Sequence, residues 1–122
     1  MITRRMNDGV LEICDERQCV LLSIAETIND KTITISLTGQ IKNEVAHELE
    51  DEIMAVLSVC SDIILDFSNV YYIASLALKS LLSIQLMVDE IEGATMKLVG
   101  VSSDVMETLK ESGLSEILMI EG

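Results

Sequence analysis

The stretch that decides the fold runs from Ile63 to Leu82 and reads IILDFSNVYYIASLALKSLL. The apolar residues ahead of Asp66 form a short run, typical of a strand that is covered on both faces in a parallel sheet. The later apolar run is too long for a strand and indicates a helix that begins at Ser75. We therefore predict a buried strand, a short turn and an apolar helix, with the functional residues in the hinge from Ser68 to Ser75.

The composition predicts a single small domain with an aliphatic core. A chain of 122 residues buries roughly two-thirds of its unfolded surface, and so needs no metal or disulfide to fold. Hydrophobic residues make up 49% of the chain, with one Phe, two Tyr and no Trp. The core must therefore be built from Ile, Leu, Val and Met, which suits an α/β or α+β domain.

The charge balance excludes some classes of partner. Eight basic and twenty-one acidic residues give a formal net charge of −13. This charge repels phosphate backbones and anionic lipids, so we expect no nucleic-acid partner. It either steers the chain toward basic protein surfaces or serves solubility alone.

The chain shows no sign of export or membrane insertion. Arg4 and Arg5 lie near the start, but no apolar region of signal-peptide length follows them. No stretch reaches the roughly 18 apolar residues of a spanning helix. We expect a cytoplasmic location and no direct membrane insertion.

The reactive side chains do not form a catalytic or metal-binding set. Cys14, Cys19 and Cys60 are an odd number of cysteines, for which reduced thiols are expected in such a chain. His47 is the single histidine, which leaves a zinc site without a plausible set of ligands. Neither a nucleophile with its base nor a phosphate-binding glycine loop can be assembled. We therefore expect no enzyme activity, no cofactor and no metal.

The first part of the chain predicts an extension followed by a hairpin. Residues 1–18 are assigned to an N-terminal extension and residues 19–122 to the domain. Within the extension, 10–14 has strand character and 15–18 has turn character. Cys19–Thr27 and Thr32–Thr38 have strand character, and Asn29-Asp30-Lys31 between them supplies turn residues.

A first helix is expected after this hairpin. Gly39 to Lys42 breaks the alternation of the second strand, and Asn43 suits the N-cap of a helix that runs to about Ser58. Its apolar residues recur at helical spacing, which gives one inward stripe: Val45, Leu49, Ile53, Val56 and Leu57. His47 is expected on the surface.

The second half of the chain alternates strands and helices. The long helix from Ser75 ends near Gly93, and Met96–Gly100 is a further buried strand. Ser102 or Ser103 caps a third helix, and Glu116–Ile120 forms the last strand. The order β-β-α-β-α-β-α-β predicts a single α/β domain whose mixed sheet is mostly parallel.

The long helix is expected to have a second apolar face. Helical spacing places a broad sector on the sheet: Leu76, Ala77, Leu81, Ile84, Met87, Val88 and Ile91. Leu78, Leu82 and Leu86 form a leucine row on the opposite, polar side. An exposed apolar row predicts a protein interface, of which a homodimer is one form. The alternatives are that the N-terminal extension covers the row or that the helix is more deeply buried.

Two segments resemble the STAS domain, the family of bacterial anti-sigma-factor antagonists. They are ILDFSNV at residues 64–70 and IASLAL at residues 73–78. The resemblance covers about residues 20–121 and implies a non-enzymatic module that binds an anti-sigma factor with serine kinase activity. In this family a partner kinase phosphorylates the serine that aligns with Ser75, and phosphorylation switches the partner and so transcription. Ala74, Leu76 and Ala77 depart from the family pattern around this serine, and the alternative is that Ser75 is a plain N-cap.

The hinge and the outward face of the long helix, taken together with this resemblance, give a set of expected partner-binding residues. Ser75 is the expected phosphoacceptor. The expected hinge contacts are Ser68, Asn69, Ala74 and Leu76, and the helical contacts are Leu78, Lys79 and Leu82. Gln40 and Ile41 lie in a loop expected beside the start of the long helix.

Two other functional classes compete with this interpretation. A phosphoaccepting receiver domain would need further carboxylates beside Asp66 to hold Mg²⁺, and these are missing, so Asp66 is predicted to accept hydrogen bonds from the hinge. STAS-like domains also serve as accessory subunits of membrane lipid transporters and as parts of stress-sensing assemblies. In either of these roles no phosphorylation of Ser75 is expected.

Overall fold

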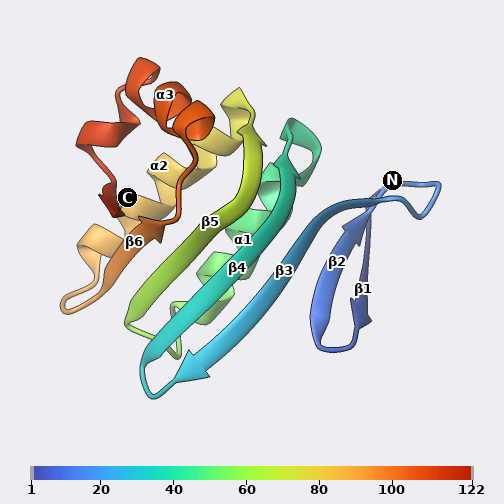
Figure 1. The fold of residues 1–122 in the computed structure, drawn as a ribbon. Coiled ribbons are helices and arrows are strands. Elements are labelled where there is room, and N and C mark those ends of the chain that lie inside the picture. The colour runs from blue at the N-terminus through green and yellow to red at the C-terminus, as the bar shows by residue number, and fades with distance from the viewer. Residues whose placement is uncertain (1, 122) are drawn as a thin grey trace.

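The computed structural model describes residues 2–121, which form one seven-stranded sheet with three helices (Figure 1). The sheet contains β1 (Thr3–Asn7), β2 (Val10–Cys14), β3 (Val20–Asn29), β4 (Thr32–Ile41), β5 (Asp62–Ile73), β6 (Thr95–Val99) and β7 (Met119–Glu121). The helices are α1 (Ala46–Val56), α2 (Ser75–Glu90) and α3 (Ser103–Glu111), with short 3₁₀ turns at Asn43–Val45 and Leu114–Glu116. The strands lie in chain order. They are antiparallel from β1 to β4 and parallel from β4 to β7.

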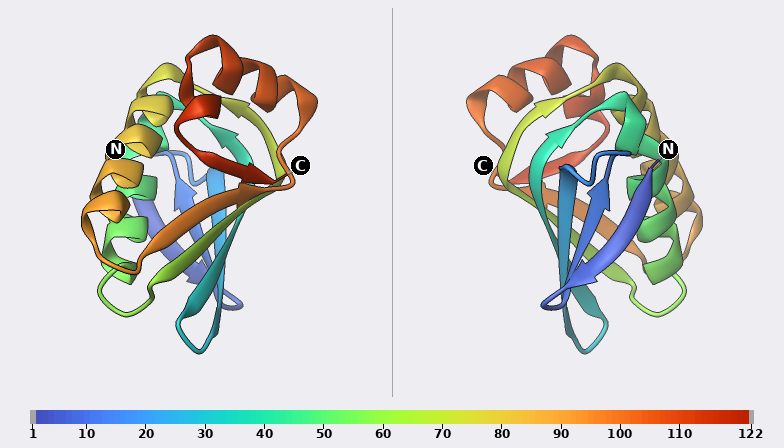
Figure 2. Two further views of the ribbon diagram at one scale, coloured as in Figure 1. Left: turned by 90° about the vertical axis from the view of Figure 1, so that its left-hand side faces the viewer. Right: turned by 90° about the vertical axis from the view of Figure 1, so that its right-hand side faces the viewer.

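The helices lie on one face and at one end of the sheet. In Figure 1, α1 and α2 run side by side behind the sheet, and α3 lies at the end toward which the parallel strands point. Figure 2 shows that the hairpin of β1 and β2 curls toward α1. Arg4 on β1 bonds Glu48 and Glu52 on α1, at 2.9 Å and 2.6 Å, and so joins the hairpin to the helix layer.

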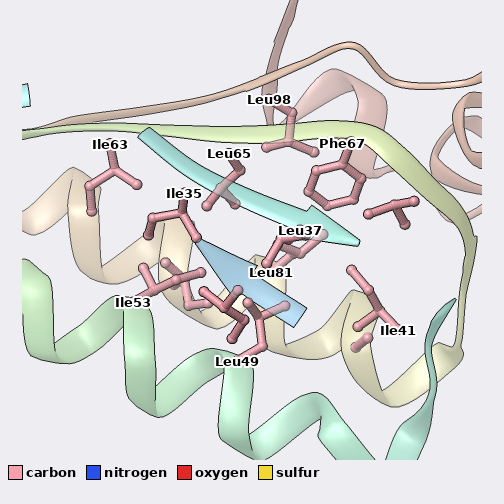
Figure 3. Close-up of a cluster of buried hydrophobic side chains, with 14 of the residues drawn as sticks. Ile35, Leu37, Ile41, Leu49, Ile53, Ile63, Leu65, Phe67, Leu81 and Leu98 are labelled. Carbon is pink, nitrogen blue, oxygen red and sulfur yellow. The ribbon is translucent and has the colours of Figure 1, made fainter. Parts of the chain in front are cut away.

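The core lies between the central strands and the two helices (Figure 3). Alternate residues of β4 and β5 face inward because side chains of a strand point to opposite faces in turn. Ile33 is paired with Ile63, and Ile35 with Leu65. Leu49 and Ile53 of α1, Leu81 of α2 and Phe67 of β5 complete the layer, and all of them are buried. Each such side chain contributes about 1.5–3 kcal/mol by leaving water.

The predicted α/β class and mixed sheet are confirmed. From β3 onward the observed order of strands and helices is the predicted one, and three of the four strand pairings there are parallel. The strand at Val10–Cys14 is also confirmed, whereas β1 was not predicted, because its polar residues show no apolar alternation. Whether residues 1–18 are an extension separate from the domain stays a prediction, although β1 and β2 continue the same sheet.

The turn predicted within the hinge from Ser68 to Ser75 is wrong, because β5 continues to Ile73. β4 likewise runs to Ile41, past the break predicted at Gly39. The two strands stay paired through two irregularities. At the first, two residues of β5 lie opposite one residue of β4. At the second, β5 contains one extra residue that has no partner on β4. The inward positions of β5 therefore change from every second residue to every third: Phe67, Val70 and Ile73 are all buried. This spacing hides the strand from a search for strict alternation.

Part of the predicted inward face of α2 is wrong. Leu76, Met87 and Ile91 are 38–41% exposed, whereas Ser80 and Gln85 are buried. α2 packs beside α1 as well as on the sheet. Because the helix has two neighbours, its buried face is rotated relative to the face predicted for packing on the sheet alone. Of the leucine row, Leu78 and Leu82 are half-buried against the core and Leu86 is 55% exposed.

The remaining reactive groups are distributed over the fold. The three cysteines are free thiols, of which Cys14 and Cys60 are buried and Cys19 is exposed. His47 is exposed on α1, as predicted. Within residues 2–121, no cluster of three or more His, Cys, Asp or Glu side chains has the arrangement of a metal site. The described helices also lack one long and apolar enough to span a membrane.

Candidate functional site

The site is built around the junction between β5 and α2. Ala74 is the N-cap residue of α2, with an extended backbone, and Ser75 is the first residue of the helix. The Ala74 N–H donates to the carbonyl oxygen of Ile41 at 2.8 Å, and the Ala74 carbonyl accepts from Leu78 N–H at 3.0 Å. The start of α2 is therefore fixed to the end of β4.

A side chain from another element caps α2. The first N–H groups of a helix have no partner within the helix, and the side chain of the N-cap residue usually accepts one of them. Ala74 has no side-chain acceptor, and Asn43 Oδ1 accepts from Leu76 N–H instead, at 3.1 Å. The prediction that Asn43 caps its own helix is therefore wrong, because its amide oxygen is turned toward α2.

Ser75 does not serve as the N-cap. It occupies the first helical position, and its side chain is exposed. Within residues 2–121, its hydroxyl has no hydrogen-bond partner, and Asn43 already provides the cap. The hydroxyl is thus accessible and is not required for the helix.

A second hydroxyl lies near the end of the paired region of β5 and β6. Asp66 Oδ1 accepts from the N–H of Ser68 at 2.9 Å and from its hydroxyl at 2.6 Å. This confirms the prediction that Asp66 accepts hydrogen bonds from the hinge. Gly100 follows β6 with a φ of 67°, and a Cβ there would collide with the Ser68 hydroxyl. Ser68 is therefore exposed but held in place from two sides.

An open hollow lies beside the start of α2, between the ends of β4 and β5. Its volume is about 520 Å³, and it is lined by Gln40, Lys42, Asn43, Glu44, Tyr71, Tyr72 and Ala74. A second hollow of about 340 Å³ continues over β3 and shares Gln40, Lys42 and Tyr71 with the first. Ala74, which lines the larger hollow, directly precedes the exposed Ser75.

Sequence reasoning missed the two tyrosines. Tyr71 is 62% exposed and Tyr72 is 48% exposed, at the end of β5. Both fall within the predicted functional hinge from Ser68 to Ser75, but neither is among the partner-binding residues expected there. The available signal was that two of the three aromatic residues of the chain stand side by side just before Ser75.

The other predicted site residues occupy different depths. Gln40 and Ala74 line the larger hollow, whereas Ile41 is fully buried in the core. Ser68, Asn69, Leu76 and Lys79 are exposed, and Leu78 and Lys79 lie on the first turns of α2. Leu82 is half-buried. The structure therefore brings most of the predicted residues to one end of the domain, around the start of α2.

The most perturbed carboxyl group lies away from this site. Partial burial and a hydrogen bond to the carboxyl group of Glu52 raise the pKa of Glu26 to about 7, and Arg4 opposes this shift. These three residues line a separate hollow between the N-terminal hairpin and α1. The raised pKa of Glu26 therefore bears on the stability of the fold and not on this site.

Comparisons with known proteins identify the fold family. A family model described as "Mlab, STAS domain" matches residues 24–121. A search of curated proteins gave no match. Three similar solved structures are an anti-sigma factor antagonist from Mycobacterium paratuberculosis, the Bacillus cell fate determinant SpoIIAA in its phosphorylated form, and a sulfate transporter family protein from Wolinella succinogenes.

These structures agree in fold at low sequence identity. The mycobacterial protein is 20% identical with a TM-score of 0.72, over 81% of this chain and 84% of the other. SpoIIAA is 17% identical with a TM-score of 0.63, over 81% and 91%. The Wolinella protein is 19% identical with a TM-score of 0.65, over 85% and 79%. The structural likeness establishes the fold, and the family model covers most of the sequence, from within β3 to the end of β7. The chain therefore belongs to the STAS domain family, whose members are regulatory binding modules.

Proposed function

We propose that this chain is a non-enzymatic antagonist of an anti-sigma factor, which it binds at the start of α2 under the control of Ser75 phosphorylation. The partner is a serine kinase that inhibits a sigma factor, or a related regulator. The observation that carries this proposal is the accessible Ser75 hydroxyl beside the open hollow, on a helix start that Asn43 caps. The solved structures named for anti-sigma factor antagonists support the same class of function.

The proposed contact set surrounds Ser75. Ser68, Asn69 and Leu76 offer exposed side chains, and Ala74 and Gln40 contribute to the wall of the hollow. Lys79 is exposed on α2. Leu78 and Leu82 are half-buried, and the exposed part of each side chain is available for contact. Ile41 is left out of the contacting side chains because it is fully buried. A homodimer through the leucine row remains a prediction.

The physical effect of phosphorylation follows from charge. A phosphoryl group adds about −1.5 to −2 charges at neutral pH. The unpaired N–H groups and the dipole of a helix N-terminus tolerate an anion, so the domain itself stays folded. A partner that packs against Leu76 and Leu78 must remove water from this dianion, which weakens binding. Modification of Ser75 thus releases the partner without unfolding the antagonist.

The test compares two exposed serines of α2. Ser75→Asp is expected to weaken binding of the chain to the kinase recovered with it from its native cells. Ser83→Asp places the same charge two turns further along the helix, on another exposed position, and is expected to retain most of the affinity. Equal affinities of Ser75→Asp and the unchanged chain would overturn the switch.

A second candidate function is an accessory subunit of a membrane lipid transporter. The structural likeness to a sulfate transporter family protein favours an association with a transporter. In this role, or as a component of a stress-sensing assembly, the same surface would hold a constant partner and Ser75 would stay unmodified. Recovery of a transporter ATPase in place of a serine kinase, with affinity unaffected by Ser75→Asp, would decide for this alternative.

A further inference from the structure

Tyr71 and Tyr72 are placed on the surface by an irregularity of β5. Gly39 pairs with Val70 and Gln40 pairs with Tyr72, so Tyr71 is an extra residue without a pairing partner on β4. Such bulges re-aim side chains and are frequent beside functional sites. Both tyrosines line the larger hollow, and Tyr71 also lines the adjoining one.

Exposed tyrosines are suited to protein recognition. A tyrosine offers a rigid apolar ring and a polar hydroxyl, and truncating such residues in interfaces often costs much of the affinity. In this chain the only other aromatic residue, Phe67, is buried in the core. The two tyrosines are therefore the only aromatic groups that the described surface offers to a partner.

The charge of this region differs from that of the whole chain. From Phe67 to Val88 the only charged residue is Lys79, although the chain has 21 acidic and 8 basic residues. Lys42 lines both hollows, where Glu44 is the one acidic residue. Within residues 2–121, neither lysine takes part in an ion pair, whereas Arg4, Arg5 and Lys97 do.

The walls of the region are preformed. β4 and β5 remain paired up to Ile41 and Ile73, Ala74 is bonded to the end of β4, and Asn43 is bonded to the start of α2. A partner that docks here does not have to order this backbone, which reduces the entropic cost of binding.

From these observations we propose that Tyr71, Tyr72, Lys42, Leu76 and Lys79, here named the tyrosine surface, dock an acidic amphipathic segment of a protein partner. Apolar side chains of that segment pack on the two rings and on Leu76. Its carboxylates pair with Lys42 and Lys79, neither of which forms an ion pair in the described structure. Glu44 is the one acidic residue that lines the hollow with Lys42. The biological identity of the partner rests on the proposed function, whereas the chemistry of the segment does not.

The same surface explains how Ser75 acts on binding. Ser75 and Lys79 are four residues apart on α2 and therefore neighbours on the helix surface. A phosphoryl group on Ser75 forms an ion pair with Lys79, and it repels the carboxylates of the acidic segment. Release of the segment is thus a direct consequence of its charge.

The experiment uses peptides, so that no partner has to be known. A phage-displayed library of random peptides is selected on the full chain and counter-selected on the Tyr71→Ala/Tyr72→Ala variant. The selected peptides are expected to combine Asp or Glu with apolar residues. Their affinity for the double variant is expected to fall at least about tenfold, the loss typical of removing interface anchors.

A second pair of variants separates binding from folding. Lys42→Gln/Lys79→Gln changes exposed side chains only and is expected to weaken the selected peptides and to reduce the salt dependence of binding. Lys31→Gln/Lys110→Gln is the matched control, because both lysines are exposed elsewhere, and it is expected to bind normally. If the Tyr71→Ala/Tyr72→Ala variant does not fold, the comparison of the two lysine variants still tests the proposal.

The outcomes separate this inference from the proposed function. Selection of basic peptides, no enrichment over the double variant, or affinity that is unaffected by Lys42→Gln/Lys79→Gln would overturn the tyrosine surface. The Ser75 switch can still stand in that case, because it is tested with the native kinase. If acidic peptides bind as expected but a chain with phosphoserine at position 75 binds them equally well, the tyrosine surface stands and the proposed switch falls.

Discussion

The side-chain oxygen of Asn43 lies 3.1 Å from the backbone nitrogen of Leu76 and accepts its hydrogen bond, so the helix beside the candidate site is capped from a different element. The two residues are 33 positions apart in the chain. This bond ties the 3₁₀ turn ahead of α1 to the first turn of α2, and it leaves the Ser75 hydroxyl free. The site thus combines a fixed backbone with an accessible nucleophilic side chain.

Loss of this cap is expected to destabilise the domain. Asn43→Ala should lower the free energy of unfolding by about 0.5–2 kcal/mol, the range for removing a helix cap. Asn43→Asp keeps the acceptor and adds a favourable charge near the helix N-terminus, so it should retain the stability. Urea unfolding followed by circular dichroism measures both. Asn69→Ala is the control, since this exposed amide has no hydrogen bond in the described structure, and an equal loss there would contradict the cap.

Gly100 should tolerate a methyl group less well than Gly113. Both have positive φ, 67° and 82°, where a residue with a Cβ costs about 1–2 kcal/mol. A Cβ at Gly113 meets no atom within 4 Å, but at Gly100 it collides with Ser68. Gly100→Ala should therefore destabilise the domain more than Gly113→Ala, as measured by thermal unfolding. Adding Ser68→Ala should recover part of the difference, and equal effects of the two glycine substitutions would show that the contact is absent.

Glu26 should make stability depend on pH. Its pKa is raised from 4.5 to about 7 in the folded chain, chiefly by burial and then by Glu52. The folded state therefore favours the protonated carboxyl, and this contribution is complete below pH 4.5 and is lost as the pH rises through 7. Glu26→Gln should raise the melting temperature at pH 8 and leave it nearly unchanged at pH 4. Glu107→Gln, an exposed position on α3, is the control, and a stabilisation by Glu26→Gln that is independent of pH would contradict the raised pKa.

Two leucines of α2 should respond very differently to truncation. Leu81 is fully buried, whereas Leu86 is 55% exposed. Leu81→Ala should cost about 2–5 kcal/mol of unfolding free energy, because it leaves a cavity in the core. Leu86→Ala should change stability by less than about 0.5 kcal/mol, as is usual for surface positions. Chemical denaturation of both variants tests the orientation of α2, and a large loss for Leu86→Ala would mean that the leucine row is more deeply buried.

Much of the fold could be predicted because its central elements obey simple periodicities. Ile33, Ile35 and Leu37 alternate with polar residues along β4, and the apolar run after Ser75 is too long for a strand. The end of β5 could not be recognised, because two irregularities replace alternation with a spacing of three, from Phe67 to Val70. A turn was therefore predicted where the chain stays extended.

The candidate site was predicted in location but not in detail. The resemblance carried Ser75, and the hydrogen bond of Asp66 followed from local geometry. The role of Asn43 could not be predicted, because its partner is distant in the chain and α1 offered a nearer helix start. Tyr71 and Tyr72 were missed because their exposure depends on the bulge in β5.

The central claim is that Ser75 controls a binding site at the start of α2. Its most direct test is phosphopeptide mass spectrometry of the chain purified from its native cells, under conditions in which its partner is both bound and released. We predict a phosphate on the peptide that contains Ser75, and a lower phosphorylated fraction in the chain that is bound to the partner. A Ser75 that is unmodified in every condition, in a chain that still exchanges partners, would contradict the account.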